Sequence, residues 1–117
     1  DVPTNDYVFF RFADVLLMRA EANFRSGNAA TALIIINNLR TTRGASVLPS
    51  LTISNILDER GRELYWEGWR REDQIRFGTF LAPKQLKTGT SSTKYLLFPI
   101  PDNDLSANPN LEQNTGF

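Results

Sequence analysis

The feature that most constrains the fold is a pair of apolar stripes at helical spacing, separated by a glycine. The first stretch covers residues 11–26, and its stripe consists of Phe9, just before it, and Ala13, Leu16, Ala20 and Phe24, widened by Phe12, Val15 and Leu17. The second stretch covers residues 29–43, and its stripe consists of Ala32, Leu33, Ile36 and Leu39, widened by Ile34 and Ile35. Recurrence at three and four positions predicts an amphipathic helix in each stretch. Gly27 ends the first helix and Asn28 can cap the second, so the two helices must lie antiparallel.

The polar residues of the first helix are predicted to form its opposite, solvent-facing side. They are Arg11, Asp14, Glu21 and Arg25. Glu21 and Arg25 are four positions apart, which favours an ion pair on a helix.

Two further helices are predicted in the second half of the chain. A third helix begins near Thr52 or Ser54, either of which can cap it, and runs to about Glu67. After Gly68, a short fourth helix covers about Arg70–Phe77, so that the third and fourth helices form a second hairpin. The fold class predicted over residues 11–78 is therefore all-α, with tetratricopeptide-like helical hairpins.

The remainder of the chain is predicted to be a long irregular tail. Residues 83–94 are rich in Thr, Ser and Lys, and residues 95–98 are interpreted as a strand or extended segment. Pro99, Pro101 and Pro109 are expected to prevent regular structure beyond it. We expect the tail, about residues 79–117, to wrap over the helices, so that residues 1–117 form a single domain.

A ladder of acids in the third helix requires partners from elsewhere. Glu59, Glu63 and Glu67 are four apart, and like charges at this spacing repel one another on an isolated helix. We expect the arginines of the preceding hairpin, together with the tail, to supply partners for these three glutamates. The predicted structural charge network consists of Glu59, Arg60, Glu63, Glu67, Arg70, Asp73 and Arg76. Gly61 lies within this helix at a cost of about 1 kcal/mol relative to Ala, which indicates a close contact there.

Composition excludes several kinds of function. Thirteen basic and thirteen acidic residues cancel, which removes the electrostatic argument for binding nucleic acid. The chain has no Cys and no His, so it lacks thiolate nucleophiles, imidazole acid–base groups and the usual zinc ligands. No cofactor site and no membrane-spanning segment is recognisable. The chain begins without an initiator Met and is interpreted as a fragment or processed piece.

Three groups of residues are candidates for a functional site, each with a structural alternative. Glu63 and Glu67 would lie roughly 6 Å apart on a helix, a separation used by glycosidase carboxylates, but the nearby arginines favour ion pairs. Trp66 is interpreted as a core residue. Trp69 and Tyr95 are candidate sugar-stacking residues, against the alternatives of a partner surface or incidental exposure. Asp102, Asn103 and Asp104 would offer oxygens to a calcium ion, although turn formation explains them as well.

Four stretches of the sequence, taken in order, resemble the C-terminal region of the SusD/RagB family of outer-membrane nutrient-binding lipoproteins. They are RFADVLLMRAEANFRSGN (11–28), INNLRTTRG (36–44), ILDERGRELYWEGWRREDQIRFG (56–78) and LFPIPDNDLSANPNLEQNTGF (97–117). Gly61 departs from the family pattern, which usually carries a large or charged residue there. Members of the family are several times longer than this chain.

The resemblance implies a binding protein rather than an enzyme. Family members capture glycans, or in some cases peptides, and cap a SusC-like TonB-dependent transporter on the outer face of the cell outer membrane. A lipid anchor and most ligand-contacting loops would lie in regions outside this chain, which would act mainly as scaffold and as a transporter-contact region. The alternative is a tetratricopeptide-like module that binds a protein or peptide in a helical groove.

Overall fold

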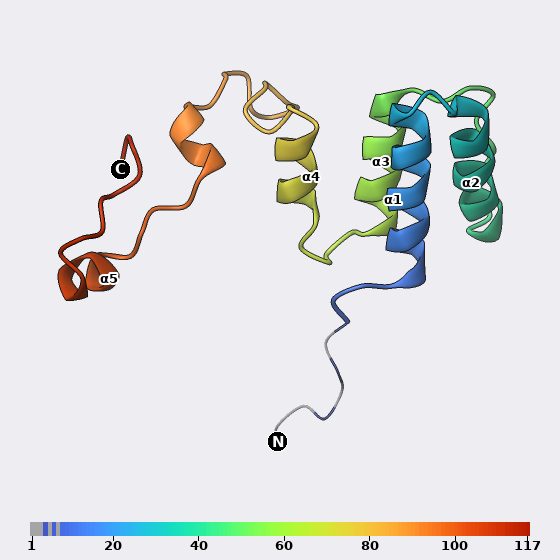
Figure 1. Cartoon of the computed structure of the whole chain (residues 1–117). Coiled ribbons are helices and arrows are strands. Elements are labelled where there is room, and N and C mark those ends of the chain that lie inside the picture. Colours follow the sequence, from blue (N-terminus) through green and yellow to red (C-terminus); the bar gives the residue numbers. More distant parts are fainter. Residues whose placement is uncertain (1–3, 5, 7) are drawn as a thin grey trace. The chain divides into compact units, whose positions relative to one another are not determined.

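The computed structural model describes residues 4, 6 and 8–117. Its elements are α1 (Phe12–Arg25), α2 (Ala29–Thr42), α3 (Ile53–Glu63), α4 (Arg70–Arg76), a 3₁₀ helix η1 (Thr93–Leu96) and α5 (Asp102–Ala107) (Figure 1). The described part of the chain contains no strand, so the predicted all-α fold class is confirmed. None of its helices has both the length and the apolarity that crossing a bilayer would require.

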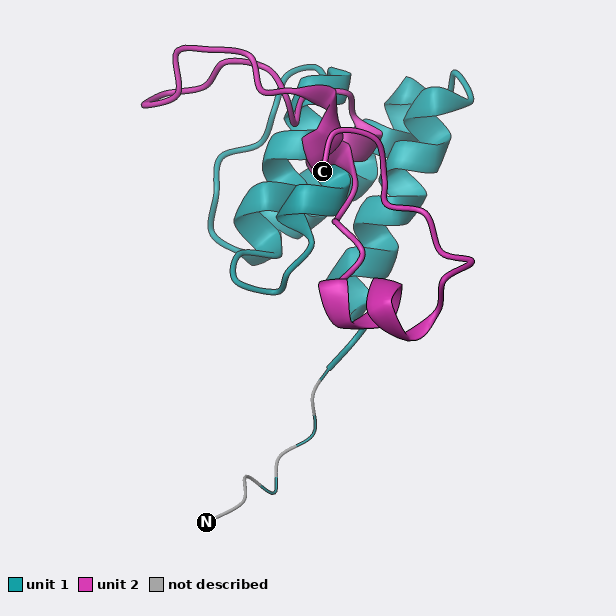
Figure 2. Cartoon of the chain, turned by 90° about the vertical axis from the view of Figure 1, so that its left-hand side faces the viewer, with its two compact units in different colours: residues 1–73 teal, residues 74–117 magenta. Residues whose placement is uncertain are grey.

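The chain divides into two compact units, Asp1–Asp73 and Gln74–Phe117 (Figure 2). The first unit contains α1, α2, α3 and the beginning of α4. The second contains the end of α4, η1 and α5. The single domain predicted for residues 1–117, and the wrapping of the tail over the helices, stay predictions.

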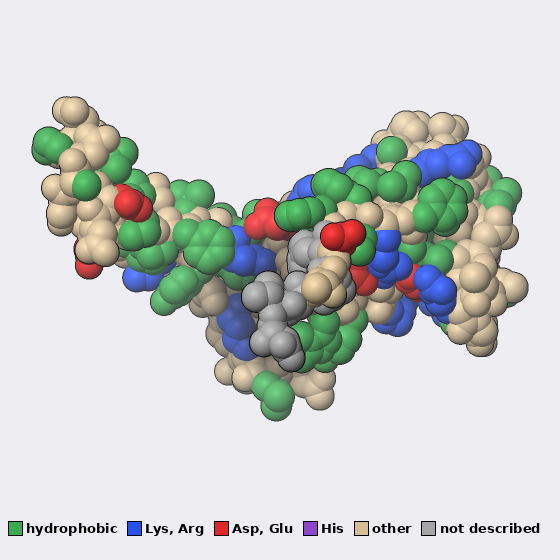
Figure 3. Space-filling view, turned by 90° about the horizontal axis from the view of Figure 1, so that it is seen from below, with side chains coloured by type: hydrophobic (Ala, Val, Ile, Leu, Met, Phe, Trp, Pro, Cys, Tyr) green, Lys and Arg blue, Asp and Glu red, His purple; other side chains and the backbone are tan. Residues whose placement is uncertain are grey.

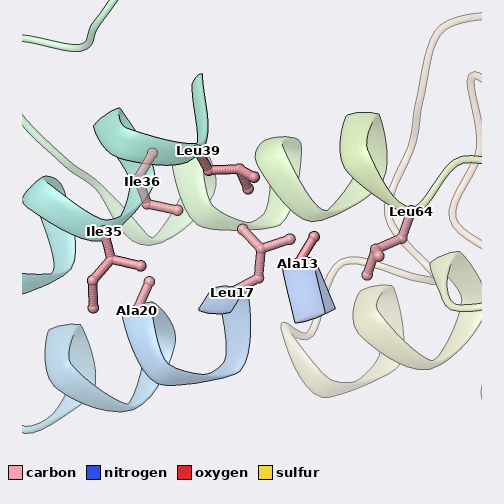
Figure 4. Close-up of a cluster of buried hydrophobic side chains, with 7 residues drawn as sticks. All are labelled: Ala13, Leu17, Ala20, Ile35, Ile36, Leu39 and Leu64. Atoms are coloured by element: carbon pink, nitrogen blue, oxygen red, sulfur yellow. The ribbon is translucent and has the colours of Figure 1, made fainter. Parts of the chain in front are cut away.

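The first unit is built around α1, which packs against both α2 and α3. Gly27 has a φ of +88° and leads directly into Asn28 and α2, so α1 and α2 form the predicted antiparallel hairpin (Figure 1). Their shared core contains Ala13, Leu17, Ala20, Ile35, Ile36, Leu39 and Leu64 (Figure 4). Burial of each Leu or Ile side chain contributes about 1.5–3 kcal/mol.

The buried face of α1 is rotated from the predicted one. Phe9, Phe12 and Val15, expected in or beside the apolar stripe, are 72%, 75% and 47% exposed, and on α2 the predicted core residue Ile34 is 60% exposed. Asp14 and Glu21, expected on the polar side, are buried. The face centres on Leu17 because α2 and α3 cover α1 from two directions, and the carboxylates beside Leu17 find arginine partners there.

Helix α3 starts at a capping box, as its sequence allows. The Thr52 hydroxyl accepts a hydrogen bond from the Asn55 N–H at 3.1 Å, and the Asn55 side-chain oxygen accepts one from the Thr52 N–H at 2.9 Å. The helix ends at Glu63, however, and not near Glu67 as predicted. The chain then turns through residues with positive φ, +66° at Trp66 and +81° at Gly68. This turn carries the chain from the end of α3 to the start of α4.

The second unit contains more regular structure than the sequence predicts. Helix α5 forms directly after Pro101, which occupies the N-cap position, where a missing N–H breaks no helical hydrogen bond. Asp102 and Asp104 lie in its first turn, where the helix dipole favours acids. The prediction that the prolines prevent regular structure is therefore wrong at this position. Tyr95 and Leu96, expected to be extended, belong to η1.

Side-chain bonds to backbone atoms hold the end of the second unit together. Gln113 accepts a hydrogen bond from the Ile100 N–H and donates one to the Ile100 carbonyl, both at 2.9 Å. Asn114 donates to the Phe98 carbonyl at 2.7 Å. The Lys94 ammonium donates to the Gly116 carbonyl at 3.1 Å. These contacts between residues far apart in the sequence make the tail a defined structure without a buried apolar core of its own.

Candidate functional site

A buried charge cluster joins three helices of the first unit. The Arg60 guanidinium, on α3, donates through Nε to both carboxylate oxygens of Asp73 on α4, at 2.7 and 2.8 Å. Its Nη1 donates to Asp14 Oδ1 on α1 at 2.9 Å. The three residues are 3%, 2% and 1% exposed respectively. Each aspartate lies in the first turn of its helix, so two helix N-termini present carboxylates to one arginine.

One carboxylate oxygen of this cluster, Asp14 Oδ2, differs from the others in its hydrogen bonding. Asp14 Oδ2 is buried and has no hydrogen-bond partner within the described residues. Two carboxylates thus share one guanidinium, and the second oxygen of Asp14 contributes nothing to the pairing. The cluster is consequently sensitive to any change that removes Arg60, because a buried unpaired carboxylate is costly.

The second acid of the ladder, Glu63, is held by two arginines. Arg11 Nη1 donates to Glu63 Oε1 at 2.6 Å, and Arg11 Nη2 also donates to the Glu63 carbonyl. Arg43 donates to both Glu63 carboxylate oxygens, at 3.0 and 2.7 Å. Arg11 reaches the third acid, Glu67, through Nε at 2.9 and 2.8 Å. The end of α3 and the turn after it are thereby tied to the start of α1 and to the residue that follows α2.

These ion pairs shift the pKa values of Glu63, Arg11 and Arg43. Hydrogen bonds from Arg43 and then Arg11 lower the pKa of Glu63 below its usual value, against the opposing effect of burial. The pKa of Arg11 is raised, chiefly by its bond to Glu67, and the pKa of Arg43 is raised by its bond to Glu63. A glutamate stabilised in its ionised form is a poor general acid, which argues against Glu63 as the proton donor of a glycosidase pair.

The first acid of the ladder, Glu59, pairs with the arginines on either side of it. Arg40 Nη1, on α2, donates to Glu59 Oε2 at 2.6 Å, and Arg62 Nη2, one turn along α3, donates to the same oxygen at 2.7 Å. Glu59 itself is 5% exposed. The bond from Arg40 connects α3 to α2, whereas Arg62 lies on α3 itself.

The remaining residues of the predicted network make different contacts. Arg70 Nη1 donates to the Leu57 carbonyl at 2.8 Å. The Arg70 guanidinium lies over Gly61, where an added Cβ would be 2.5 Å from Arg70 Nη1. This is the close contact that the glycine indicates in the sequence. The Arg76 guanidinium lies 4.9 Å from the centre of the Phe77 ring.

The network contains residues that the prediction for α3 and α4 did not name. They are Arg11, Asp14, Arg40, Arg43 and Arg62. Arg62 lies on α3 itself, and the other arginines belong to the preceding hairpin, which was expected to supply partners for the acids. Asp14 was assigned to the polar side of α1, although its position three residues before the core residue Leu17 places it on the same helical face. The three-residue spacing between Asp14 and Leu17 is the sequence signal that could have placed Asp14 on the buried face of α1.

The aromatic candidates lie in different surroundings. Trp69 is partly buried, packs against the core cluster and lies 5.6 Å from Phe10 between ring centres. Tyr95 is 49% exposed and has the Lys94 ammonium 5.3 Å from its ring centre. Trp66 is 88% exposed, so the interpretation of Trp66 as a core residue is wrong for this chain. Its positive φ, which costs an L-residue roughly 1–2 kcal/mol, accompanies the turn that ends α3.

A pocket of about 770 Å³ opens beside this turn. Its walls include Arg60, Arg62, Tyr65, Trp66, Arg70 and Arg71. It is a mixed aromatic and cationic surface. No cluster of acidic residues suited to a metal ion occurs within the described residues, and Asp102 and Asp104 instead belong to the first turn of α5.

The first unit is a helical scaffold in which α1 packs on α2 and α3, cross-linked by buried arginine–carboxylate pairs. The predicted second hairpin of α3 and α4 is not formed by packing of these two helices, because α1 is the helix that covers α3. Comparison with known proteins identifies the family. The SusD family model matches residues 2–89. The starch-binding protein SusD of Bacteroides thetaiotaomicron is 40% identical over 98% of this chain and 22% of its own length. The chain therefore belongs to the SusD family.

Solved structures show the same relationship. The surface glycan-binding protein A of Bacteroides uniformis superimposes with a TM-score of 0.78 at 29% identity, over 94% of this chain and 28% of that protein. A putative sugar-binding protein of Bacteroides vulgatus gives a TM-score of 0.74 at 29% identity, over 92% of this chain and 28% of that protein. The chain spans about a quarter of the length of the relatives it matches.

Proposed function

We propose that the chain is part of a non-catalytic, glycan-binding component of an outer-membrane nutrient uptake system. The observation that carries this proposal is the 40% identity, over nearly the whole chain, to a protein named for starch binding. Two structural neighbours are likewise described as glycan-binding or sugar-binding. The glycan would be captured without covalent chemistry and passed to a transporter.

Within such a protein, residues 1–117 would act mainly as scaffold. The network of Glu59, Arg60, Glu63, Glu67, Arg70, Asp73 and Arg76 would serve structure and not catalysis. Its support is that Arg60, Glu59 and Glu63 each bond to residues outside their own helix. Glycan contacts would come mostly from regions outside this chain. Trp69 and Tyr95 stay candidate ligand-binding residues, and Tyr95 has the more exposed ring of the two.

The proposed partner is a SusC-like TonB-dependent transporter, and the proposed location is the outward face of the outer membrane, reached through a lipid anchor outside this chain. Co-purification of the full-length protein with the transporter encoded beside it would test the partnership. Isolation of the full-length protein in the soluble fraction, without bound lipid and without that transporter, would contradict both assignments.

Isothermal titration of the full-length protein against a panel of polysaccharides tests the binding function. We expect saturable binding of at least one glycan, with no release of reducing sugar. Hydrolysis of a bound glycan that is abolished in the Glu63→Gln variant would overturn the non-catalytic assignment. Binding of peptides but of no glycan would favour the tetratricopeptide-like alternative.

A further inference from the structure

The pocket at the turn between α3 and α4 combines aromatic rings with polar side chains. Its volume of about 770 Å³ falls within the roughly 300–1,000 Å³ of small-molecule sites. All the residues that line it lie between Asp58 and Arg71, so the pocket belongs to the first unit alone. Tyr65 and Trp66 contribute rings whose centroids are 6.0 Å apart, at an interplanar angle of 89°. A hollow that joins aromatic surface to a few polar groups is the usual form of a ligand site.

Trp66 is held in a backbone conformation that a tryptophan rarely adopts. Its φ of +66° lies in the left-handed region, which glycine enters without steric cost. Gly68, two residues further along the same turn, has a φ of +81°. The indole of Trp66 is not among the core residues, so packing in the core does not offset this strain. Strained residues cluster at ligand sites, where the backbone fixes the direction of a functional side chain.

The polar side chains of the wall can bind hydroxyl groups. Arg70 donates a hydrogen bond to the Leu57 carbonyl at 2.8 Å, and it pairs with no carboxylate of the described residues. A guanidinium has five N–H donors, so most of those of Arg70 are left for an occupant. Asp58, on the same wall, offers acceptor oxygens. Sugar hydroxyls both donate and accept hydrogen bonds, and the C–H face of a pyranose ring packs on an aromatic ring.

The pocket differs from the rest of the surface in more than the kinds of side chain that it gathers. Figure 3 shows hydrophobic side chains next to arginines or lysines over much of one face, so such adjacency alone does not define a site. The turn between α3 and α4 adds a hollow of small-molecule size and a tryptophan at positive φ in its wall. Trp69, by contrast, packs against the core and lies 5.6 Å from Phe10 between ring centres.

We propose that this pocket is a glycan subsite, in which a pyranose ring stacks on the indole of Trp66. Tyr65 borders the same ring, and the neighbouring hydroxyls accept hydrogen bonds from Arg70 and donate to Asp58. The inference rests on the proposed glycan-binding function and adds to it a contact within residues 58–71. It assigns the stacking role to Trp66 in place of Trp69.

Oxidative footprinting of the full-length protein tests whether a glycan or the polypeptide covers the pocket. Mass spectrometry reads the modification of Tyr65 and Trp66, with a free peptide as the reference for radical dose. The probes are soluble starch, arabinoxylan, laminarin and pectin, of which starch is chosen because a relative is named for starch binding. We expect both residues to react readily in the glycan-free protein and several-fold more slowly with a polysaccharide that isothermal titration shows to bind.

The other outcomes separate the subsite from the binding function. Binding of none of the four polysaccharides would remove the support for both. Binding of one of them with unchanged modification of Trp66 would overturn the subsite alone. Trp66 that reacts as slowly without glycan as with it would also overturn the subsite, since residues 74–117 or another part of the polypeptide would then cover the ring.

Replacement of Trp66 by glycine separates a ligand contact from a structural one. Trp66→Gly in the full-length protein removes the ring and relieves the positive φ, so the urea denaturation midpoint should stay equal or rise. Its affinity for the bound polysaccharide should fall about ten-fold or more, the scale for loss of an aromatic anchor. Trp66→Phe, which keeps a ring, should lose less affinity.

Phe12→Ala is the matched control, since Phe12 is an exposed aromatic residue on α1 outside the pocket wall, and its affinity should match that of the wild type. A lowered midpoint with unchanged affinity in Trp66→Gly would show that the indole packs on polypeptide, and would refute the subsite.

Discussion

Replacement of Arg60 by methionine is the most informative test of the scaffold. The variant keeps a long apolar side chain of similar reach and removes the guanidinium that holds Asp14 and Asp73. Asp14 is 1% exposed, and its Oδ1 bond to Arg60 is the side-chain contact that the substitution removes. Its Oδ2 already has no partner within the described residues. The variant therefore leaves a buried carboxylate without compensation.

The expected loss follows from the geometry. Three charge-assisted hydrogen bonds disappear, and breaking a buried ion pair by removing one partner costs about 3–5 kcal/mol. This is a large share of the roughly 5–15 kcal/mol that stabilises a typical domain. With a urea dependence of about 1–3 kcal/mol per molar, the denaturation midpoint should fall by roughly 1–5 M, or the chain should fail to fold.

Urea denaturation of the 117-residue chain, followed by circular dichroism at a helical wavelength, measures the effect. Arg19→Met is the matched control, since Arg19 is exposed, and should change the free energy of unfolding by no more than about 0.5 kcal/mol. Adding Asp14→Asn to Arg60→Met should restore part of the loss, because the orphaned charge is gone. A loss below about 1 kcal/mol for Arg60→Met, with no rescue by Asp14→Asn, would refute the reasoning.

Three further predictions concern single positions. The lowered pKa of Glu63 means that its ionised form adds stability above the usual carboxyl pKa of 4.5, and that this stability is lost as the pH falls through the lower folded-state pKa. The free energy difference between wild type and Glu63→Gln, from urea denaturation, should therefore be about 1–3 kcal/mol at pH 7 and should shrink below pH 4.5; a pH-independent difference would contradict this. Gly61→Ala should be close to neutral by the same assay, because the gain of helix propensity is offset by displacing Arg70, whereas in an Arg70→Ala background it should stabilise by about 1 kcal/mol; equal effects in both backgrounds would deny the contact. Leu17→Ala, at a fully buried position, should cost about 2–5 kcal/mol, against a much smaller loss for the exposed control Met18→Ala, and similar losses for the two would contradict the observed core.

The ladder of acids in α3 is a sequence pattern that allows one physical solution. Three glutamates at four-residue spacing repel one another on a helix, so they require cations from other segments. The partners that the structure shows are Arg11, Arg40, Arg43 and Arg62. Spacing along one helix could not say which arginine meets which acid, because the pairs join residues as many as 56 positions apart.

The end of α3 was harder to predict. The stretch from Leu64 to Glu67 has no proline and keeps a helical pattern of acids, so propensity alone continues the helix. Burial of Leu64 in the core and the bond between Arg60 and Asp73 instead need the chain to turn there. The same turn exposes Trp66, although the hydrophobic character of its side chain alone predicts a position in the core.

The sequence by itself determined the all-α class, the α1–α2 hairpin, the close contact at Gly61 and the family. Each depends on local spacing, on a glycine or on a run of residues that matches the family pattern. Such features can be recognised in the sequence without knowledge of tertiary contacts. Only the tertiary structure decided that Asp14 is buried beside Arg60 and that Trp66 faces a pocket. These outcomes depend on which segments meet in space, because the free energy of a buried charge or an exposed ring is set by its neighbours and not by its place in the chain.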